Sequence, residues 1–225
     1  KPFILSHDKL YLNRFYHYES DVAALISARN VALGIPDANL LATKLEQHFG
    51  DAEHNRQKLA AFLAITRKLA VITGGPGTGK TSTVVKILDI LLEESPDLTI
   101  KLVAPTGKAA MRLSDSISEW AATREKKFQV QTLHRLLGMR KDGRTWRHGP
   151  QNQLKVDLLI VDEASMIDLT MMHRLLGALP DHTRLILLGD PNQLPSVDTG
   201  NVLADLCAGE PGFSSTFGEL ASNFV

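Results

Sequence analysis

Several features are scarce in this sequence, and each scarcity excludes a class of protein. The only cysteine is Cys207, so no disulfide forms within the chain, and a reducing cytosol is the expected compartment. No apolar run approaches the ~18 residues needed to cross a bilayer, and no signal-peptide pattern opens the chain. Lysine plus arginine equal aspartate plus glutamate at 25 each, so the chain lacks the overall basic charge of many nucleic-acid-binding proteins. The composition therefore favours a cytoplasmic protein with no membrane span.

The composition nevertheless supports a substantial core. The 225 residues are 44% hydrophobic, which is sufficient for one large domain with a small appendage. The sequence starts at Lys1 rather than at methionine and stops abruptly at Val225, so we expect a fragment of a longer protein. Charge is locally uneven, since the stretch 124–147 holds eight basic residues and two acidic ones.

Short apolar runs alternate with helical stretches along most of the chain. Strands are expected at 69–73, 99–103, 157–161 and 184–188, each followed by a helix, the first of these at 83–93. A small hairpin at 3–5 and 10–12 and helices at 19–33, 38–49 and 55–66 come before them. Continuous leucine and β-branched runs between helices predict an α/β fold with a parallel sheet covered on both faces. Ligands of such sheets bind beyond the carboxyl ends of the strands.

The most specific motif is a phosphate-binding loop. Residues 74–81 read GGPGTGKT and fit G-x-x-x-x-G-K-[ST], whose backbone N–H groups and lysine surround nucleotide phosphates. The loop lies between a predicted strand and a predicted helix, whose N-terminal dipole adds to the anion site. The alternative is a glycine-rich turn whose lysine has no role in phosphate binding.

Two further motifs also follow predicted strands directly. Asp162 and Glu163 are paired carboxylates suited to holding Mg²⁺ and polarising a water molecule, or alternatively to capping a helix. Gln193, in the segment GDPNQL, places a side-chain amide where it would sense a terminal phosphate. Three of the four predicted strands thus end in a motif that suits nucleoside triphosphate hydrolysis.

Other segments suit contact with DNA. Thr106 and Lys108 follow the strand at 99–103 and open a helix, so they either grip a DNA phosphate or act as an ordinary cap and a solvated lysine. Thr132 and His134 lie in a short predicted helix at 131–138, where a lone histidine is more often structural. The segment 139–153 contains the hairpin-type pair Asp-Gly at 142–143 and a tryptophan among basic residues.

The five segments GGPGTGKT, APTGKAA, TLHRLLG, LLIVDEASMID and LLGDPNQLPSV occur in this order within residues 52–206. In spelling and order they resemble the first motor domain of superfamily 1 DNA helicases, and most closely the RecD-type family that includes the alpha subunit of bacterial exodeoxyribonuclease V. The resemblance implies a P-loop NTPase with a RecA-like motor domain (1A) at 51–225, a small inserted hairpin (1B-like) at 139–153, and an N-terminal region ending at residue 50. By the same resemblance, we expect the family's second motor domain to lie outside these 225 residues. Whether residues 1–50 dock on the motor or on a neighbouring subunit stays open.

The resemblance also assigns roles. Lys80 neutralises the β- and γ-phosphates, Thr81 and Asp162 hold Mg²⁺, Glu163 activates the attacking water, and Gln193 senses the γ-phosphate. Gln57 resembles the glutamine that reads the adenine of ATP, although it is equally an ordinary exposed helix residue. The remaining nucleotide-binding positions are Gly75, Pro76, Gly77, Thr78, Gly79 and Ser82. The implied contacts with single-stranded DNA are Thr106, Lys108, Thr132, His134, Arg144 and Trp146, the last as a stacking residue or as a tucked side chain in a mobile loop.

The implied activity is a 5′–3′ DNA helicase that couples ATP hydrolysis to translocation in double-strand-break repair and recombination, with RecB- and RecC-like partner subunits. A stand-alone RecD-like or transfer-type helicase and a nucleotide-dependent switch ATPase are the alternatives. Because related motors use arginines of the second motor domain, we expect the isolated chain to bind nucleotide weakly and to hydrolyse it very slowly.

Overall fold

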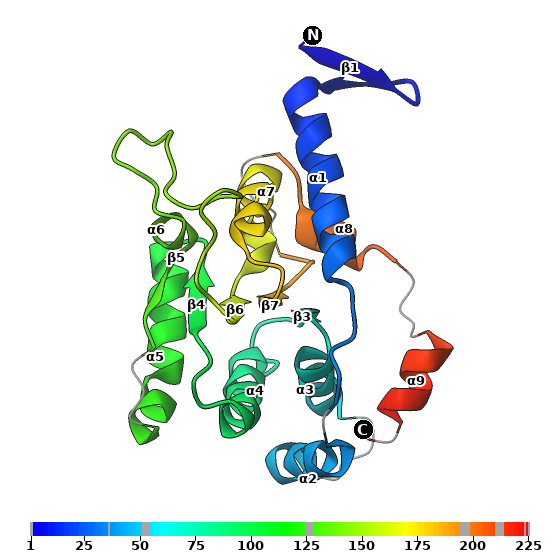
Figure 1. Ribbon diagram of the computed structural model, residues 1–225, viewed down its shortest axis with the longest axis vertical. Helices are drawn as coiled ribbons and strands as arrows, with labels where there is room; N and C mark the ends of the chain where they lie inside the picture. Colours follow the sequence, from blue (N-terminus) through cyan, green and yellow to red (C-terminus); the bar gives the residue numbers. More distant parts are fainter. Residues whose placement is uncertain are drawn as a thin grey trace.

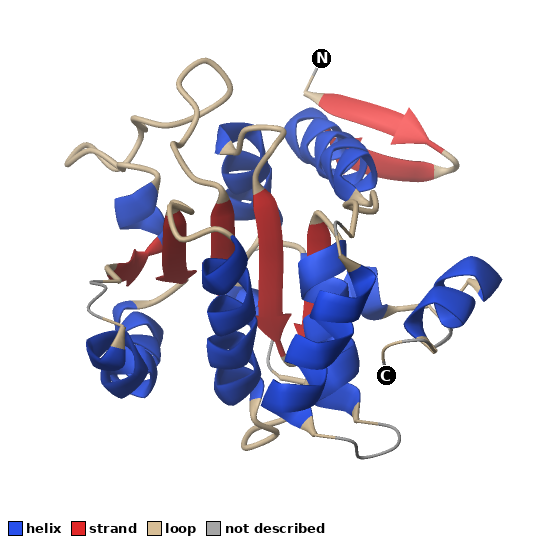
Figure 2. Ribbon diagram, turned by 60° about the horizontal axis from the view of Figure 1, so that its bottom comes forward, coloured by secondary structure: helices blue, strands red, loops and turns tan. Residues whose placement is uncertain are grey.

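The computed structural model describes residues 2–35, 37–50, 55–124, 128–193, 199–209, 214–222 and 224. Its centre is a five-stranded parallel sheet of order β3-β7-β6-β4-β5, flanked by helices (Figure 2). The strands are β3 (Leu69–Thr73), β4 (Ile100–Ala104), β5 (Val130–Thr132), β6 (Leu158–Val161) and β7 (Arg184–Gly189). The predicted parallel α/β fold is therefore confirmed. None of the helices in the described ranges is long and apolar enough to cross a membrane.

Four strands lie within one residue of their predicted bounds, whereas β5 was missed. The prediction of a helix over 131–138 was wrong at its start, because Gln131 and Thr132 pair with β4 and the helix α6 spans only Leu133–Leu136. The strand β5 is three residues long, half-buried and partly polar, so it carries no apolar run. Pairing with its neighbour, rather than its own composition, makes it a strand.

The sheet separates two hydrophobic cores because its side chains alternate between faces. Leu158 and Ile160 of β6 belong to one core, together with residues of α2 (Ala38–Phe49), α3 (Arg56–Thr66), α4 (Lys80–Glu94) and α5 (Gly107–Thr123). Leu159 and Val161 belong to the other, with α1 (Asn13–Arg29), α6, α7 (Leu169–Ala178) and α8 (Val202–Cys207). The helix α9 (Ser215–Ala221) contributes Phe217 and Ala221 to the first core. Burial on both faces explains the continuous apolar strands.

The N-terminal helix α1 starts and ends earlier than predicted. It follows directly on the hairpin of β1 (Phe3–Ser6) and β2 (Lys9–Leu12), and the Asn13 amide donates to the Pro2 carbonyl at 2.9 Å. The chain after Arg29 is extended, because it pairs with the segment around residue 67. The Leu33 amide donates to the Thr66 carbonyl at 2.7 Å, and the Lys68 amide donates to the Val31 carbonyl at 3.1 Å. The predicted hairpin is confirmed, and it projects from the end of α1 (Figure 1).

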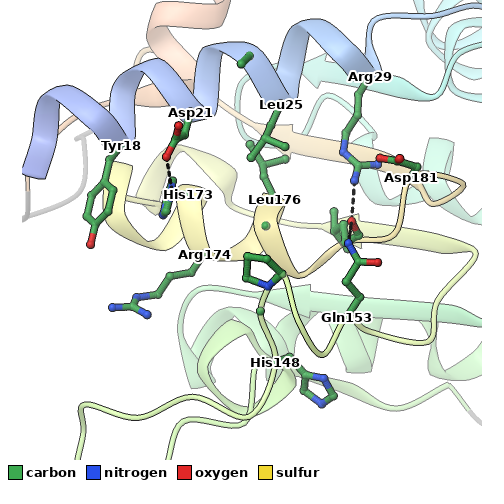
Figure 3. Close-up of a pocket in the computed structure, with 15 residues that line it drawn as sticks. Tyr18, Asp21, Leu25, Arg29, His148, Gln153, His173, Arg174, Leu176 and Asp181 are labelled. Atoms are coloured by element: carbon green, nitrogen blue, oxygen red, sulfur yellow. Dashed lines mark hydrogen bonds and ion pairs between the residues drawn. The ribbon is translucent and has the colours of Figure 1, made fainter.

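The helix α1 docks on the sheet domain through α7. Figure 3 shows this contact beside a cavity of about 500 Å³ that residues 148–153 help to line. His173 of α7 stacks on Tyr18 with ring centroids 4.3 Å apart and bonds to the Asp21 carboxylate at 3.0 Å. At the far end of α1, the buried Arg29 guanidinium donates to backbone carbonyls of residues 179, 180 and 183. The question left open by the sequence is thereby answered for α1, which packs on this chain's own core.

The segment 139–153 begins as a short antiparallel hairpin that is too brief to form two regular strands. The Arg140 amide donates to the Thr145 carbonyl at 2.9 Å, and the Arg147 amide donates to the Gly138 carbonyl at 3.1 Å. One antiparallel bridge joins Met139 to Trp146, and the Gly143 amide donates to the Arg140 carbonyl at 2.9 Å. The turn therefore centres on residues 141–142, one residue before the Asp-Gly pair expected to form it. The Asp142 carboxylate explains the shift, since it accepts the amides of residues 144 and 145 at 2.9 and 3.0 Å.

Candidate functional site

Three of the sequence motifs converge at one edge of the sheet. In the parallel register Thr73 pairs with Gly189 and Val161 pairs with Leu187, so β3, β7 and β6 end side by side. Gly74 is the first residue after β3, and its backbone amide donates to the Gly189 carbonyl at 3.2 Å. Residues 74–81, the Asp-Glu pair and the GDPNQ segment are therefore neighbours at the carboxyl edge, where such sheets bind ligands.

The loop at 74–79 has the backbone shape of an anion cradle. Gly77 and Gly79 have φ of +76° and +81°, which L-residues rarely adopt. Thr78 closes the loop by donating from its hydroxyl to the Gly75 carbonyl at 2.9 Å. The left-handed Gly79 lets the helix α4 begin at Lys80, three residues earlier than predicted, so the helix N-terminus points at the cradle.

Lys80 lies between this loop and the acidic pair. Its ammonium group donates to the carbonyl of Gly74 and, at 2.9 Å, to that of Gly75. Its positive charge also lowers the pKa of both Asp162 and Glu163, although this opposes a larger effect of burial. The geometry places the cation where a phosphate group in the loop would meet it.

Burial raises the pKa of Asp162 and of Glu163. For Glu163 the Asp162 charge adds to the effect of burial, whereas Lys80 and Arg112 oppose it. Asp162 accepts the Glu163 amide on Oδ1 at 2.9 Å. Glu163 has φ +52° and ψ +42°, a left-handed conformation that costs a residue with a side chain about 1 kcal/mol or more. A strained, half-buried carboxylate beside a lysine is typical of a functional site.

The loop after β7 brings two polar residues to the same place. Asp190 is 7% exposed, accepts the Asn192 amide at 3.0 Å, and its charge contributes to the raised pKa of Glu163. The backbone amide of Gln193 donates to the Asp190 carbonyl at 3.1 Å. The rest of the segment that the sequence singled out, residues 194–197, lies outside the described residues.

Gln57 also reaches the phosphate loop. It lies in the first turn of α3, where Asn55 caps the helix, and its Nε2 donates to the Thr78 carbonyl at 3.1 Å. The structure thus brings Gln57 together with the nucleotide motifs. Of the other predicted positions, Pro76 and Ser82 are exposed and Thr81 is half-buried in the first turn of α4.

Four of the residues expected to contact DNA lie at the same edge, where the neighbouring strands β4 and β5 end. Ala104 pairs with Thr132, so the helices after β4 and β5 start side by side. Thr106 accepts the Ala109 amide at 3.2 Å and Thr132 accepts the Arg135 amide at 3.3 Å, so each threonine caps its helix. Lys108 and His134 are exposed beside these caps.

Trp146 and Arg144 lie in different environments. Arg144 is exposed at the turn of the 139–153 segment. Trp146 is half-buried against the second core, with the His134 ring 5.6 Å away and the Arg174 guanidinium 5.0 Å from its centroid. Trp146 is thus tucked against the protein on at least one face.

The sequence reasoning missed three residues that the structure brings to these sites. Asp190 stands in a motif that had been singled out for its glutamine, so the signal was visible. Arg112 follows Lys108 by four residues, the helical spacing that places both side chains on one face of α5. Arg174 carried no sequence signal, because its contact with Trp146 depends on tertiary packing.

The glycine cradle at a helix N-terminus, its lysine and the carboxylates on the adjacent strand define a P-loop nucleotide-binding domain. The chain belongs to the AAA domain family, which matches residues 57–199. It is similar to the RecBCD enzyme subunit RecD of Mycolicibacterium smegmatis, with 45% identity over 219 residues, 90% of this chain and 38% of that protein. The resemblance to RecD stated from the motifs is therefore confirmed.

Two further relatives carry RecD-type names. RecD of Haemophilus influenzae is 46% identical over 179 residues, 72% of this chain and 28% of that protein. The ATP-dependent RecD2 DNA helicase of Deinococcus radiodurans is 43% identical over 149 residues, 66% of this chain and 19% of that protein. The chain spans less than two fifths of the length of the relatives it matches.

Proposed function

We propose that this chain is the ATP-binding motor domain of a RecD-type 5′–3′ DNA helicase. The observation that carries the proposal is the division of one sheet edge into two halves. The nucleotide motifs follow β3, β7 and β6, and the segments suited to DNA follow β4 and β5. Nucleotide chemistry and DNA contact therefore share adjacent strand ends, so a small rearrangement at one site reaches the other directly.

The residues at the nucleotide half suit hydrolysis of ATP. The loop amides and Lys80 bind the phosphates, and Lys80 exchanges its carbonyl partners at residues 74 and 75 for phosphate oxygens. Glu163 orients the attacking water and accepts its proton, and a raised pKa makes it a stronger base than an ordinary glutamate. The water oxygen bonds to the γ-phosphorus, the bond to the bridging oxygen breaks, and ADP and phosphate leave.

The donor set fits Mg²⁺. Thr81 and Asp162 offer a hydroxyl and a carboxylate, and Mg²⁺ in nucleotide sites is held by few protein oxygens together with phosphates and water. When bound, the ion neutralises charge on the phosphates. Gln193, anchored through its backbone to Asp190, reports the loss of the γ-phosphate, and Gln57 recognises adenine.

At the other half of the edge, capped helix starts and exposed cations contact single-stranded DNA. The residues assigned to DNA are Thr106, Lys108, Thr132, His134, Arg144 and Trp146. Helix N-termini and basic side chains bind phosphates without reading sequence, as translocation requires.

The complete protein works with RecB- and RecC-like subunits in double-strand-break repair and recombination. Relatives named as RecBCD subunits support this part of the proposal. The likeness to a RecD2 helicase favours a second candidate, a RecD-like helicase that acts alone. Co-purification of the complete protein with or without such subunits distinguishes the two.

The test measures ATP hydrolysis by the complete protein with and without single-stranded DNA, in the wild type and in Lys80→Gln. We expect strong stimulation by DNA that the substitution abolishes. Turnover indifferent to DNA would refute the helicase and promote the switch ATPase. Because related motors use arginines of a second motor domain, we expect the 225 residues by themselves to hydrolyse ATP very slowly, and robust hydrolysis would contradict that expectation.

A further inference from the structure

Two consecutive residues of α7 make side-chain contacts with two different segments of the chain. His173 contacts α1 through Tyr18 and Asp21, whereas Arg174 lies over the indole ring of Trp146. Figure 3 shows His173 turned toward α1 and Arg174 pointing away from it. The helix α7 therefore connects the N-terminal helix on one side to the 139–153 segment on the other.

Trp146 is one of the points at which the 139–153 segment is fastened to the domain, and at the far end of the segment the Gln153 side chain donates to the Leu179 carbonyl at 3.2 Å. The backbone of Trp146 forms an antiparallel β-bridge with Met139 across the base of the segment. Its ring lies 5.0 Å from the Arg174 guanidinium and 5.6 Å from the His134 ring, tilted by 34° to the latter. The turn beyond this base, including Arg144, is exposed. The orientation of the turn thus depends on how Trp146 is held.

The same contacts join the DNA half of the sheet edge to the nucleotide half. His134 lies in α6, whose cap is Thr132. Arg174 lies in α7, which begins at Leu169, shortly after Glu163 and a single 3₁₀ turn at Ala164–Met166. Arg174 and Trp146 therefore form a direct side-chain contact between the helix that leaves the acidic pair and the segment expected to meet DNA.

We propose that Trp146 is a positioning residue for single-stranded DNA, held in place by Arg174, rather than a platform on which a base stacks. Its ring sets the orientation of His134 and of the Arg144 turn, and these groups meet the DNA. This inference rests on the proposed function and refines it. The arginine keeps an indole face occupied, because a guanidinium over tryptophan is a favourable cation–π contact, strongest where water is excluded.

The experiment uses the complete protein and compares Trp146→Ala, Trp146→Phe, Arg174→Met and the double variant Trp146→Ala/Arg174→Met. It measures ATP turnover without DNA, maximal turnover with an oligothymidylate, and the oligothymidylate concentration that gives half-maximal stimulation. Methionine retains the apolar stem of Arg174 and removes its charge. His173→Gln is the matched control, since it alters the neighbouring residue and its contact with α1 only.

We expect Trp146→Ala to raise the half-maximal DNA concentration about tenfold and Arg174→Met about threefold, as the loss of a cation–π contact permits. In Arg174→Met, turnover without DNA should stay close to that of the wild type. Trp146→Phe should restore most of the affinity for DNA, and the double variant should equal Trp146→Ala. His173→Gln should leave the half-maximal concentration unchanged.

Two results would overturn the inference. If Arg174→Met leaves the half-maximal DNA concentration unchanged, Trp146 acts without it. If the effects of the two substitutions multiply, each residue contacts DNA by itself. A wild-type protein that DNA does not stimulate would instead refute the proposed function, so the two failures are distinguishable.

Discussion

The side-chain amide of Gln57 donates to the backbone carbonyl of Thr78 at 3.1 Å across 21 residues of sequence. The bond fastens the first turn of α3 to the phosphate loop. A Cβ atom built on Gly79 would lie 2.5 Å from the same Nε2 atom, so the loop and the glutamine fit closely. Gln57 is therefore held directly against the phosphate loop.

Replacing Gln57 with alanine should weaken the preference for ATP over GTP by about tenfold, as the loss of a hydrogen-bonding group in a specificity site permits. The KM for ATP should rise more than kcat falls, because the chemistry lies at the other end of the nucleotide. Steady-state hydrolysis of both nucleotides by the complete protein measures this. Arg56→Ala, an exposed neighbour in the same turn, is the control and should change neither value. An unaltered preference in Gln57→Ala would show that Gln57 only braces the loop.

Replacing Glu163 with glutamine should lower ATP turnover by about 10²–10⁴-fold, the usual contribution of a general base, while nucleotide still binds. The same change should raise the melting temperature of the nucleotide-free protein at neutral pH. Burial and the Asp162 charge raise the pKa of Glu163, so its ionised form costs folding free energy above that pKa, and the cost disappears as pH falls through it.

Thermal melts of wild type and Glu163→Gln at neutral and mildly acidic pH test the second part. The stabilisation should shrink as the pH is lowered. Glu119→Gln, at an exposed position of α5, should show no such gain. A Glu163→Gln protein that melts lower than the wild type at neutral pH would contradict the interpretation of Glu163 as a destabilising functional group.

Replacing Arg29 with methionine should destabilise the domain by about 1–3 kcal/mol, because carbonyls of residues 179, 180 and 183 lose their donor in a buried place. Relief of the cost of burying the guanidinium, which also lowers the pKa of Arg29, offsets part of the loss. Urea unfolding measures the change. Arg14→Met, on the exposed part of the same helix, should stay within about 0.5 kcal/mol of the wild type. Equal stability of Arg29→Met and Arg14→Met would mean that α1 docks without this anchor.

Replacing Asp142 with alanine should loosen the turn at 140–145. Hydrogen bonds from the hydroxyl and amide of Thr145 and the amide of Arg144 lower the pKa of Asp142 to about 2. The ionised carboxylate therefore stabilises the turn at neutral pH, and this contribution is lost as the pH falls from the ordinary value of 3.8 toward 2.

Amide hydrogen exchange at residues 144 and 145 reports this loosening and should be faster in Asp142→Ala at neutral pH. The melting temperature should stay unchanged, because the turn is exposed. Asp115→Ala, at an exposed position on α5, should leave exchange in the turn as it is. Unchanged exchange at residues 144 and 145 in Asp142→Ala would show that the rest of the segment holds the turn.

The predictability of each element follows from how local its cause is. The strand β3 and the loop after it were predictable because a continuous apolar run and a glycine spacing are both read within a dozen residues. The strand β5 was not, since Gln131 and Thr132 become strand only by pairing with β4. The turn at 140–145 was misplaced by one residue because the Asp142 carboxylate, rather than the Asp-Gly pair, fixes its geometry.

The fold class, the phosphate loop and the acidic pair are predictable from the sequence, because apolar periodicity and motif spacing encode them over short stretches of chain. Only tertiary packing sets the strand order β3-β7-β6-β4-β5, which separates the strands followed by the nucleotide motifs from the strands followed by the segments expected to contact DNA. It also decided that Arg29 anchors α1 across 150 residues and that Arg174 covers Trp146. Such contacts depend on the packing of side chains that no local pattern relates, so they exist only once the two cores have formed around the sheet.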